Sequence, residues 1–105
     1  MEDQRIHVVQ LKLLYEFNKR NQTSGETVEE YIRSLYVAAV RCNFSVDVRD
    51  EMIRDRIVVG ILSPKAREKM LLMCNLTLED AKTISKNVEM YEKQGRFEGF
   101  PFTRN

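Results

Sequence analysis

Residues 22–42 constrain the fold most, because they combine a polar turn with the start of an amphipathic helix. Gly25 lies in the turn, where glycine reaches backbone angles that other residues avoid. Thr27-x-x-Glu30 has the form of a capping box, in which both side chains accept hydrogen bonds from backbone N–H groups at a helix start. Apolar residues then recur at helical spacing: Val28, Tyr31, Ile32, Leu35, Ala38, Ala39 and Cys42. This stretch predicts a well-capped helix with one face in a core.

Two polar residues of the turn, Gln22 and Glu26, are candidates for more than local capping. A glutamine amide both donates and accepts hydrogen bonds, and a carboxylate at a helix start accepts from several backbone N–H groups. Thr23-x-x-Glu26 also has capping-box form, so a cap four residues earlier is the alternative start of the helix. We interpret the pair as one that pins the incoming loop to the helix.

Helical periodicity recurs through most of the remaining chain, and no strand-like alternation competes with it. Asp47 precedes one helix as its expected N-cap, Ser63-Pro64 opens another, and Gln94-Gly95 closes the last. Gly60 weakens the end of its helix. The expected ranges, beside the helix of 28–42, are 5–18, 48–61, 63–74 and 77–93. The fold class is therefore all-α, a small globule of four or five helices.

The chain has the size of one small domain, with 105 residues. We expect residues 1–94 to form this helical domain, with residues 1–19 as its leading helix. Residues 95–105 contain glycine and proline and show no helical period, so they are expected to be a tail.

The first helix is apolar on more than one side. One stripe contains Ile6, Val9, Leu13 and Phe17, while Val8, Leu11, Leu14 and Tyr15 spread apolar surface over much of the rest. Such a helix must be covered on more than one side. Two interpretations stay open: a central core helix, or a helix whose outer surface is covered by a partner chain.

The helix of 48–61 carries two apolar stripes. The isoleucines Ile53, Ile57 and Ile61 repeat every four residues and should face the core. A second stripe of Val48, Met52 and Val59, with Arg56 beside it, is either a broad extension of the core or a self-association surface. The predicted dimer interface comprises Val48, Met52, Ile53, Arg56 and Val59.

Composition argues against several functional classes. A structural zinc site needs about four cysteine or histidine ligands, whereas the chain has Cys42, Cys74 and His7, so we expect no metal or cofactor. No GxSxG, HExxH or glycine-rich phosphate loop is present, and we expect no enzymatic activity. A net charge of +1 indicates weak nucleic-acid binding or none. No apolar run approaches the roughly 20 residues of a membrane span. The few cysteines favour a reduced intracellular location, with a single disulfide left open.

An ordered set of residues resembles the major homology region of retroviral and retrotransposon Gag proteins, which marks the C-terminal half of the capsid protein. The set runs through Gln22, Glu26, Val28, Tyr31-Ile32 and Leu35. Phe17-x-x-Arg20-x-Gln22, followed by Gly25-Glu26-Thr27-Val28-Glu29-Glu30-Tyr31-Ile32, is similar to the version in gypsy-type LTR retrotransposons. The resemblance continues through residues 41–44, 51–61 and 76–81, and it spans residues 11–93.

The resemblance implies a polar network of Gln22, Gly25, Glu26, Tyr31 and the position of Ser34. Ser34 stands where the retroviral motif has the arginine that completes this network, so the sequence does not predict the complete network. The resemblance also implies that the helix of 48–61 carries a two-fold dimer contact.

The function implied is self-association for the assembly of a capsid or virus-like particle. One alternative is a domesticated Gag domain that serves a host protein as a dimerisation adaptor, as SCAN domains and the neuronal Arc protein do. Another is a monomeric peptide-binding lobe. The expected partner is a second copy, as homodimer or higher oligomer, and the expected location is cytoplasmic, or nuclear for an adaptor of a transcription factor.

Overall fold

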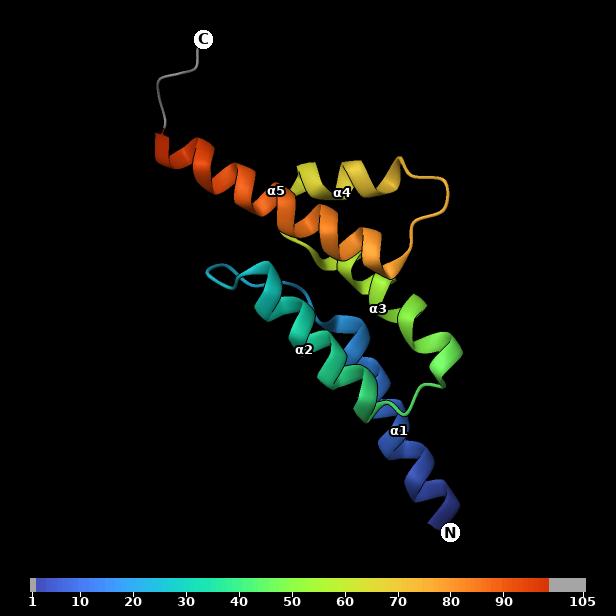
Figure 1. Cartoon of the computed structure of the whole chain (residues 1–105). Coiled ribbons are helices and arrows are strands. Elements are labelled where there is room, and N and C mark those ends of the chain that lie inside the picture. The colour runs from blue at the N-terminus through green and yellow to red at the C-terminus, as the bar shows by residue number, and fades with distance from the viewer. Residues whose placement is uncertain (1, 99–105) are drawn as a thin grey trace.

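Five helices follow one another along the part of the chain that the computed structural model describes, residues 2–98 for the backbone and 8–94 for side chains (Figure 1). They are α1 (Glu2–Lys19), α2 (Val28–Arg41), α3 (Val46–Gly60), α4 (Pro64–Leu71) and α5 (Leu78–Glu98). These residues contain no strand. The predicted all-α fold is confirmed.

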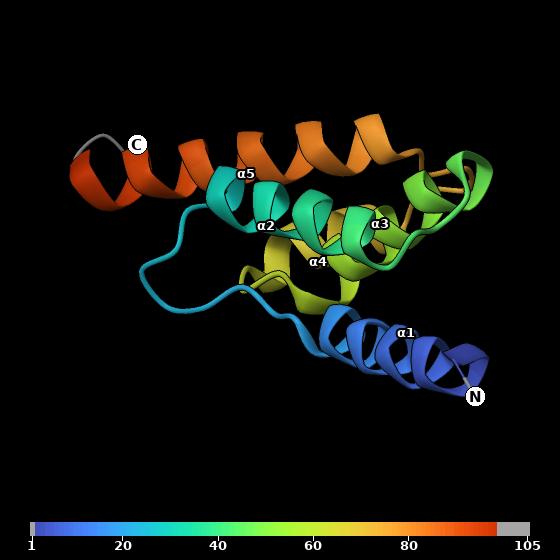
Figure 2. The ribbon, with the colours of Figure 1, turned by 90° about the horizontal axis from the view of Figure 1, so that it is seen from below.

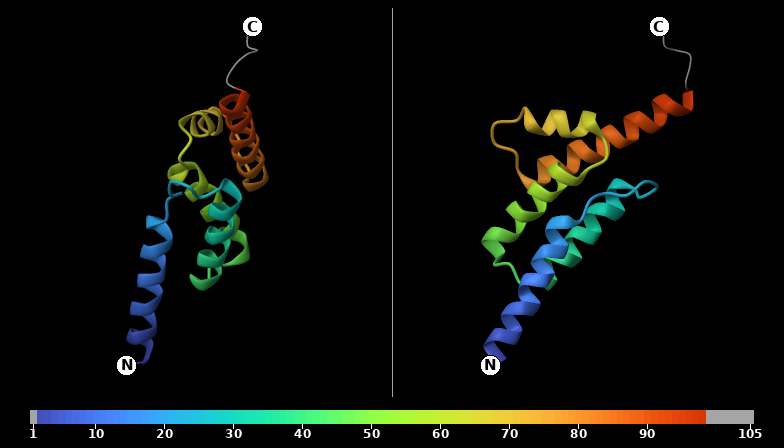
Figure 3. Two further views of the ribbon diagram at one scale, coloured as in Figure 1. Left: turned by 90° about the vertical axis from the view of Figure 1, so that its left-hand side faces the viewer. Right: turned by 180° about the vertical axis from the view of Figure 1, so that it is seen from behind.

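The helices are arranged with α1 and α5 on opposite sides and the other three between them (Figure 2). Helix α1 packs mainly against α2, while α5 contacts α2, α3 and α4. The beginning of α1 and the end of α5 project beyond their neighbours (Figure 3), and the molecule measures 67 × 29 × 16 Å. The core therefore lies where α2, α3 and α5 meet.

The predicted inward faces of α2 and α3 are confirmed by burial. Water hardly reaches the isoleucines of α3, which are Ile53, Ile57 and, at the residue that ends the helix, Ile61. From α2 and the residue that ends it, the buried side chains are Val28, Tyr31, Ile32, Leu35, Ala39 and Cys42. Phe17 of α1 is fully buried, and its ring meets that of Phe44 edge-on at a centroid distance of 5.3 Å. Fully burying a large apolar side chain stabilises a fold by about 1.5–3 kcal/mol.

Helical spacing in residues 63–74 and 77–93 also predicts inward positions for Leu71, Cys74 and Tyr91, and these three predictions are wrong. Leu71, the last residue of α4, is 68% exposed. Cys74 is exposed because α4 ends at Leu71, three residues earlier, so the helical face does not extend to it. Tyr91 is also exposed, because α4 covers this part of α5 only from one side and leaves an open groove there. Cys74 and the buried Cys42 are both free thiols.

The start of α3 and the end of α5 also differ from the prediction. The N-cap of α3 is Ser45, whose backbone is extended, so Asp47 lies in the first helical turn, where a carboxylate is also favourable. Helix α5 continues through Gly95 to Glu98, since an isolated glycine lowers helix stability by about 1 kcal/mol without forbidding the helix. The tail prediction therefore fails for residues 95–98, and residues 99–105 lie outside the described residues.

Helix α5 also ties the starts of two other helices to the core. The predicted capping box of α2 is present, with Thr27 and Glu30 bonded reciprocally. In addition, a Glu89 carboxylate oxygen of α5 accepts a hydrogen bond from the Val28 N–H at 2.8 Å. Glu92, one turn later, accepts one from the hydroxyl of Ser63, the N-cap of α4. Glu89 thus satisfies an N–H group that has no partner in its helix, and the negative charge of both carboxylates is favourable near a helix start.

Candidate functional site

The residues that resemble the major homology region begin in the loop between α1 and α2, here called the polar loop and comprising residues 20–27, and continue into α2. Gly25 has a φ of +89°, in the left-handed region that side chains disfavour. A Cβ atom at Gly25 would meet no atom within 4 Å. The turn therefore requires glycine for its backbone conformation and not for space.

Gln22 links the polar loop to two other segments. The residue is buried, with 8% of its surface exposed, and its amide nitrogen donates to the backbone carbonyl of Glu26 at 2.9 Å. The amide oxygen accepts from the backbone N–H of Leu62, also at 2.9 Å. The backbone N–H of Gln22 donates to the carbonyl of Gly60, at the end of α3. Gln22 thus connects the C-terminal end of α3 to the loop that leads into α2.

Glu26 joins two other residues of the polar loop, Thr23 and Arg20. One carboxylate oxygen accepts from the Thr23 backbone N–H at 3.0 Å and from the Thr23 hydroxyl at 3.3 Å. The other oxygen forms an ion pair with the Arg20 guanidinium. Burial acts to raise the pKa of Glu26, but the hydrogen bonds from Arg20 and Thr23, together with the Arg20 charge, outweigh it. The pKa of this carboxyl is therefore lowered from its ordinary value of 4.5.

The lowered pKa makes the fold sensitive to acid through this carboxylate. A group whose pKa is lower in the folded state stabilises that state above the unfolded pKa and loses this effect as pH falls through the folded pKa. We expect Glu26→Gln to lower the free energy of unfolding by about 1–3 kcal/mol at neutral pH, the scale of hydrogen bonds to a charged group. The difference from the native chain should shrink steadily below pH 4.5 in urea titrations.

Glu29→Gln is the matched control, because Glu29 pairs with Arg33 on an exposed helix face. Such a pair contributes about 0.3–0.5 kcal/mol. A Glu26→Gln variant that is no less stable than Glu29→Gln at neutral pH would contradict the assigned role of Glu26.

Tyr31 inserts its hydroxyl between the polar loop and α3. The hydroxyl lies 2.8 Å from the Arg56 carbonyl oxygen, to which it donates, and 3.2 Å from the Arg20 carbonyl oxygen. Burial raises the pKa of Tyr31 to about 12, so the phenol is neutral at physiological pH. The hydroxyl occupies the space that a side chain at Gly60 would need, 2.1 Å from the position of a Cβ atom there.

Arg56 joins this network rather than standing free at the edge of a dimer contact. Its guanidinium donates to the Arg20 carbonyl at 2.8 Å and to the Asn21 side-chain oxygen at 2.7 Å. Ser34 does not take part, because its hydroxyl donates to the Tyr31 carbonyl within α2 at 2.7 Å. In this chain the arginine that pairs with Glu26 is Arg20, which lies in the polar loop and not on α2.

Sequence reasoning assigned no role in the network to Arg20, Asn21, Arg56 and Gly60. Only Arg20 carried a signal, as part of the Phe17-x-x-Arg20-x-Gln22 pattern. Arg56 and Gly60 reach the polar loop from α3, through hydrogen bonds to Asn21 and Gln22, which lie about 35 to 40 positions away in the sequence.

The predicted dimer interface on α3 is only partly accessible. Val48 is 43% exposed and Val59 is 60% exposed, on the side of α3 away from the core. Met52, between them, is half-buried and packs against the core. Ile53 is fully buried, so its assignment to an interface is wrong: the spacing of four from Ile57 places it on the inward face. The remaining surface, Val48, Met52 and Val59, is called the α3 stripe.

Helix α1 also keeps an apolar side in water. Phe17 faces the core, while Val8, Leu11 and Tyr15 are each half or more exposed. Their spacing of three and four residues places these three side chains on one face, called here the outer α1 face. The structure therefore excludes a central core helix and retains the alternative of a helix that leaves apolar surface uncovered within one chain.

The part of the chain that the structure describes gathers no group of three His, Cys, Asp or Glu side chains able to hold a metal ion. None of the described helices is long and apolar enough to cross a membrane. No family model, no curated protein and no solved structure matches the chain.

Proposed function

We propose that this chain is a non-enzymatic self-association module of the Gag type, similar to a capsid C-terminal domain. The observation that carries the proposal is the α3 stripe, whose valines stay exposed although Ile53 and Ile57 on the opposite face of α3 are fully buried. The polar loop supports it, since its residues follow the order of the major homology region and hold the end of the helix that bears the stripe.

A second copy of the chain is the partner that fits this surface. In a two-fold contact the same patch packs against itself, so an apolar stripe meets an apolar stripe. The net charge of +1 adds little repulsion between copies. The stripe is short, so we expect a weak dimer. A dissociation constant near 1 μM corresponds to about −8 kcal/mol.

Assembly beyond a dimer needs a second kind of contact, because a two-fold interface closes on itself. The outer α1 face offers that contact, on a different helix from the α3 stripe. A lattice that uses both surfaces multiplies weak contacts through effective concentration. A dimerisation adaptor in a host protein would need only the α3 contact, without the outer α1 face.

Val59→Asp is expected to weaken dimerisation by about tenfold or more, because a two-fold contact brings two carboxylates together and desolvates both. Val59 is a sharper choice than Met52, since Met52 packs against the core and its substitution would also disturb the fold. The measurement is sedimentation over a wide range of concentrations, with circular dichroism to check helicity.

Val37→Asp on α2 is the matched control, since Val37 is 57% exposed and off the stripe. The native chain and this control should show the same concentration-dependent dimer. A native chain that is monomeric at every concentration, or a dimer that survives Val59→Asp, would overturn the assignment of the α3 stripe.

A further inference from the structure

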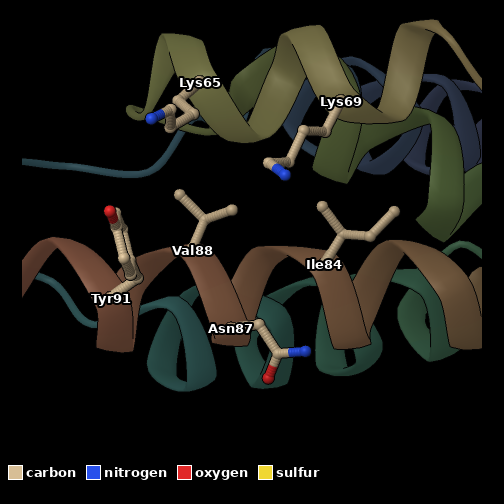
Figure 4. A pocket seen from close by; sticks show the side chains of 6 residues that line it. All are labelled: Lys65, Lys69, Ile84, Asn87, Val88 and Tyr91. Carbon is tan, nitrogen blue, oxygen red and sulfur yellow. The ribbon is translucent and has the colours of Figure 1, made fainter.

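A groove of about 480 Å³ runs between α4 and α5, on surfaces that the proposed self-association does not use (Figure 4). Helix α4 contributes Lys65 and Lys69 to it. Helix α5 contributes Ile84, Asn87, Val88 and Tyr91. The two helices run antiparallel, so Lys65 lies beside Tyr91 and Lys69 lies across from Ile84 and Val88 (Figure 4).

The floor of the groove is apolar and its rim is cationic. Ile84 and Val88 point from α5 toward α4, and Lys69 reaches into the space above them (Figure 4). Lys65 lies 5.6 Å from the centre of the Tyr91 ring, an arrangement that leaves its charge open to a carboxylate. Among the described residues, neither lysine forms an ion pair with a carboxylate.

The chain does neutralise a lysine on the neighbouring helix. Lys82, on α5, pairs with Glu79 and donates to the Tyr36 hydroxyl at 3.0 Å. These contacts, led by the hydrogen bond to Tyr36, raise the pKa of Lys82. The groove lysines differ in that no carboxylate is among the residues that line the groove with them.

We propose that this groove binds a short acidic amphipathic segment of a partner protein. An apolar side chain of that segment would lie on Ile84 and Val88, and carboxylates on either side would pair with Lys65 and Lys69. The positive charges of Lys65 and Lys69 favour a segment that carries carboxylates.

Other occupants fit less well. A second copy in a two-fold arrangement would place lysines against lysines, which costs energy. A nucleic acid needs a broader basic surface than two lysines in a chain of net charge +1. A small inorganic anion would leave the apolar floor uncovered.

The test uses a fluorescein-labelled peptide that alternates leucine or phenylalanine with glutamate, and measures fluorescence anisotropy against the full chain. We expect saturable binding that weakens with added salt, because exposed ion pairs are screened. The Lys65→Glu/Lys69→Glu double variant should bind about tenfold more weakly or worse. Backbone amide shifts in NMR spectra should concentrate on α4 and α5.

Lys86→Glu/Lys93→Glu is the matched control, since both lysines are exposed, lie on α5 and are absent from the groove lining. It makes the same change in net charge, and its affinity should stay within about twofold of the native value. A peptide with lysine in place of glutamate should not bind. Absence of saturable binding, or equal losses in the two double variants, would overturn the proposal, whatever the oligomeric state.

Discussion

Gly60→Ala is expected to lower the free energy of unfolding by about 3 kcal/mol or more, although alanine is the better helix former. In an open helix this change would stabilise the chain by about 1 kcal/mol. Here the new Cβ would lie 2.1 Å from the Tyr31 hydroxyl, 2.9 Å from the Asn21 side-chain oxygen and 3.0 Å from the Arg20 carbonyl oxygen. Overpacking on this scale costs about 1–3 kcal/mol, and displacing the buried hydroxyl adds the loss of its hydrogen bond.

A double-mutant cycle with Tyr31→Phe identifies the cause. The phenylalanine removes the oxygen at 2.1 Å, so Gly60→Ala should cost less in that background. Urea unfolding of the four variants gives the coupling. An additive cycle, or a Gly60→Ala chain as stable as the native one, would show that the approach of Tyr31 does not determine the residue at position 60.

The sequence alone was enough to predict features formed by residues that are close together in the chain. The capping box of Thr27 and Glu30, the inward stripe of α2 and the isoleucines of α3 all follow from spacings of three and four residues. Gln22 and Glu26 also form a local unit, since the Gln22 amide bonds to the carbonyl of Glu26. The sequence-based interpretation of this pair rested on that short separation.

Features that depend on distant contacts were not predictable in the same way. Gly60 was interpreted as a weak helix end, whereas its small size admits Tyr31 from another helix. Arg56 was assigned to a dimer surface because its neighbours are apolar, and it bonds instead to the polar loop. The bond from Val28 to Glu89 joins residues 61 positions apart. A helical period identifies the faces of one helix, but not which neighbour covers each face.

Gln22→Ala is expected to lower the free energy of unfolding by about 2–4 kcal/mol, on the order of two buried groups left without partners. The substitution removes the acceptor of the Leu62 N–H and the donor to the Glu26 carbonyl. Gln22 is 8% exposed, so water does not replace these bonds without opening the loop. Gln94→Ala, which removes an exposed glutamine from α5, should cost less than about 0.5 kcal/mol.

Gln22→Glu tests the two side-chain hydrogen bonds of Gln22 separately. A glutamate keeps an acceptor for Leu62 but turns its second oxygen toward the Glu26 carbonyl, where a donor is needed. We therefore expect it to be less stable than the native chain at neutral pH and to recover part of the loss in acid, when a protonated carboxyl again donates. Urea titrations at several pH values measure both effects. Equal stability of Gln22→Ala and Gln94→Ala would mean that the loop holds α3 without Gln22. The order of residues that resembles the major homology region would then lack the structural role that links it to the α3 stripe.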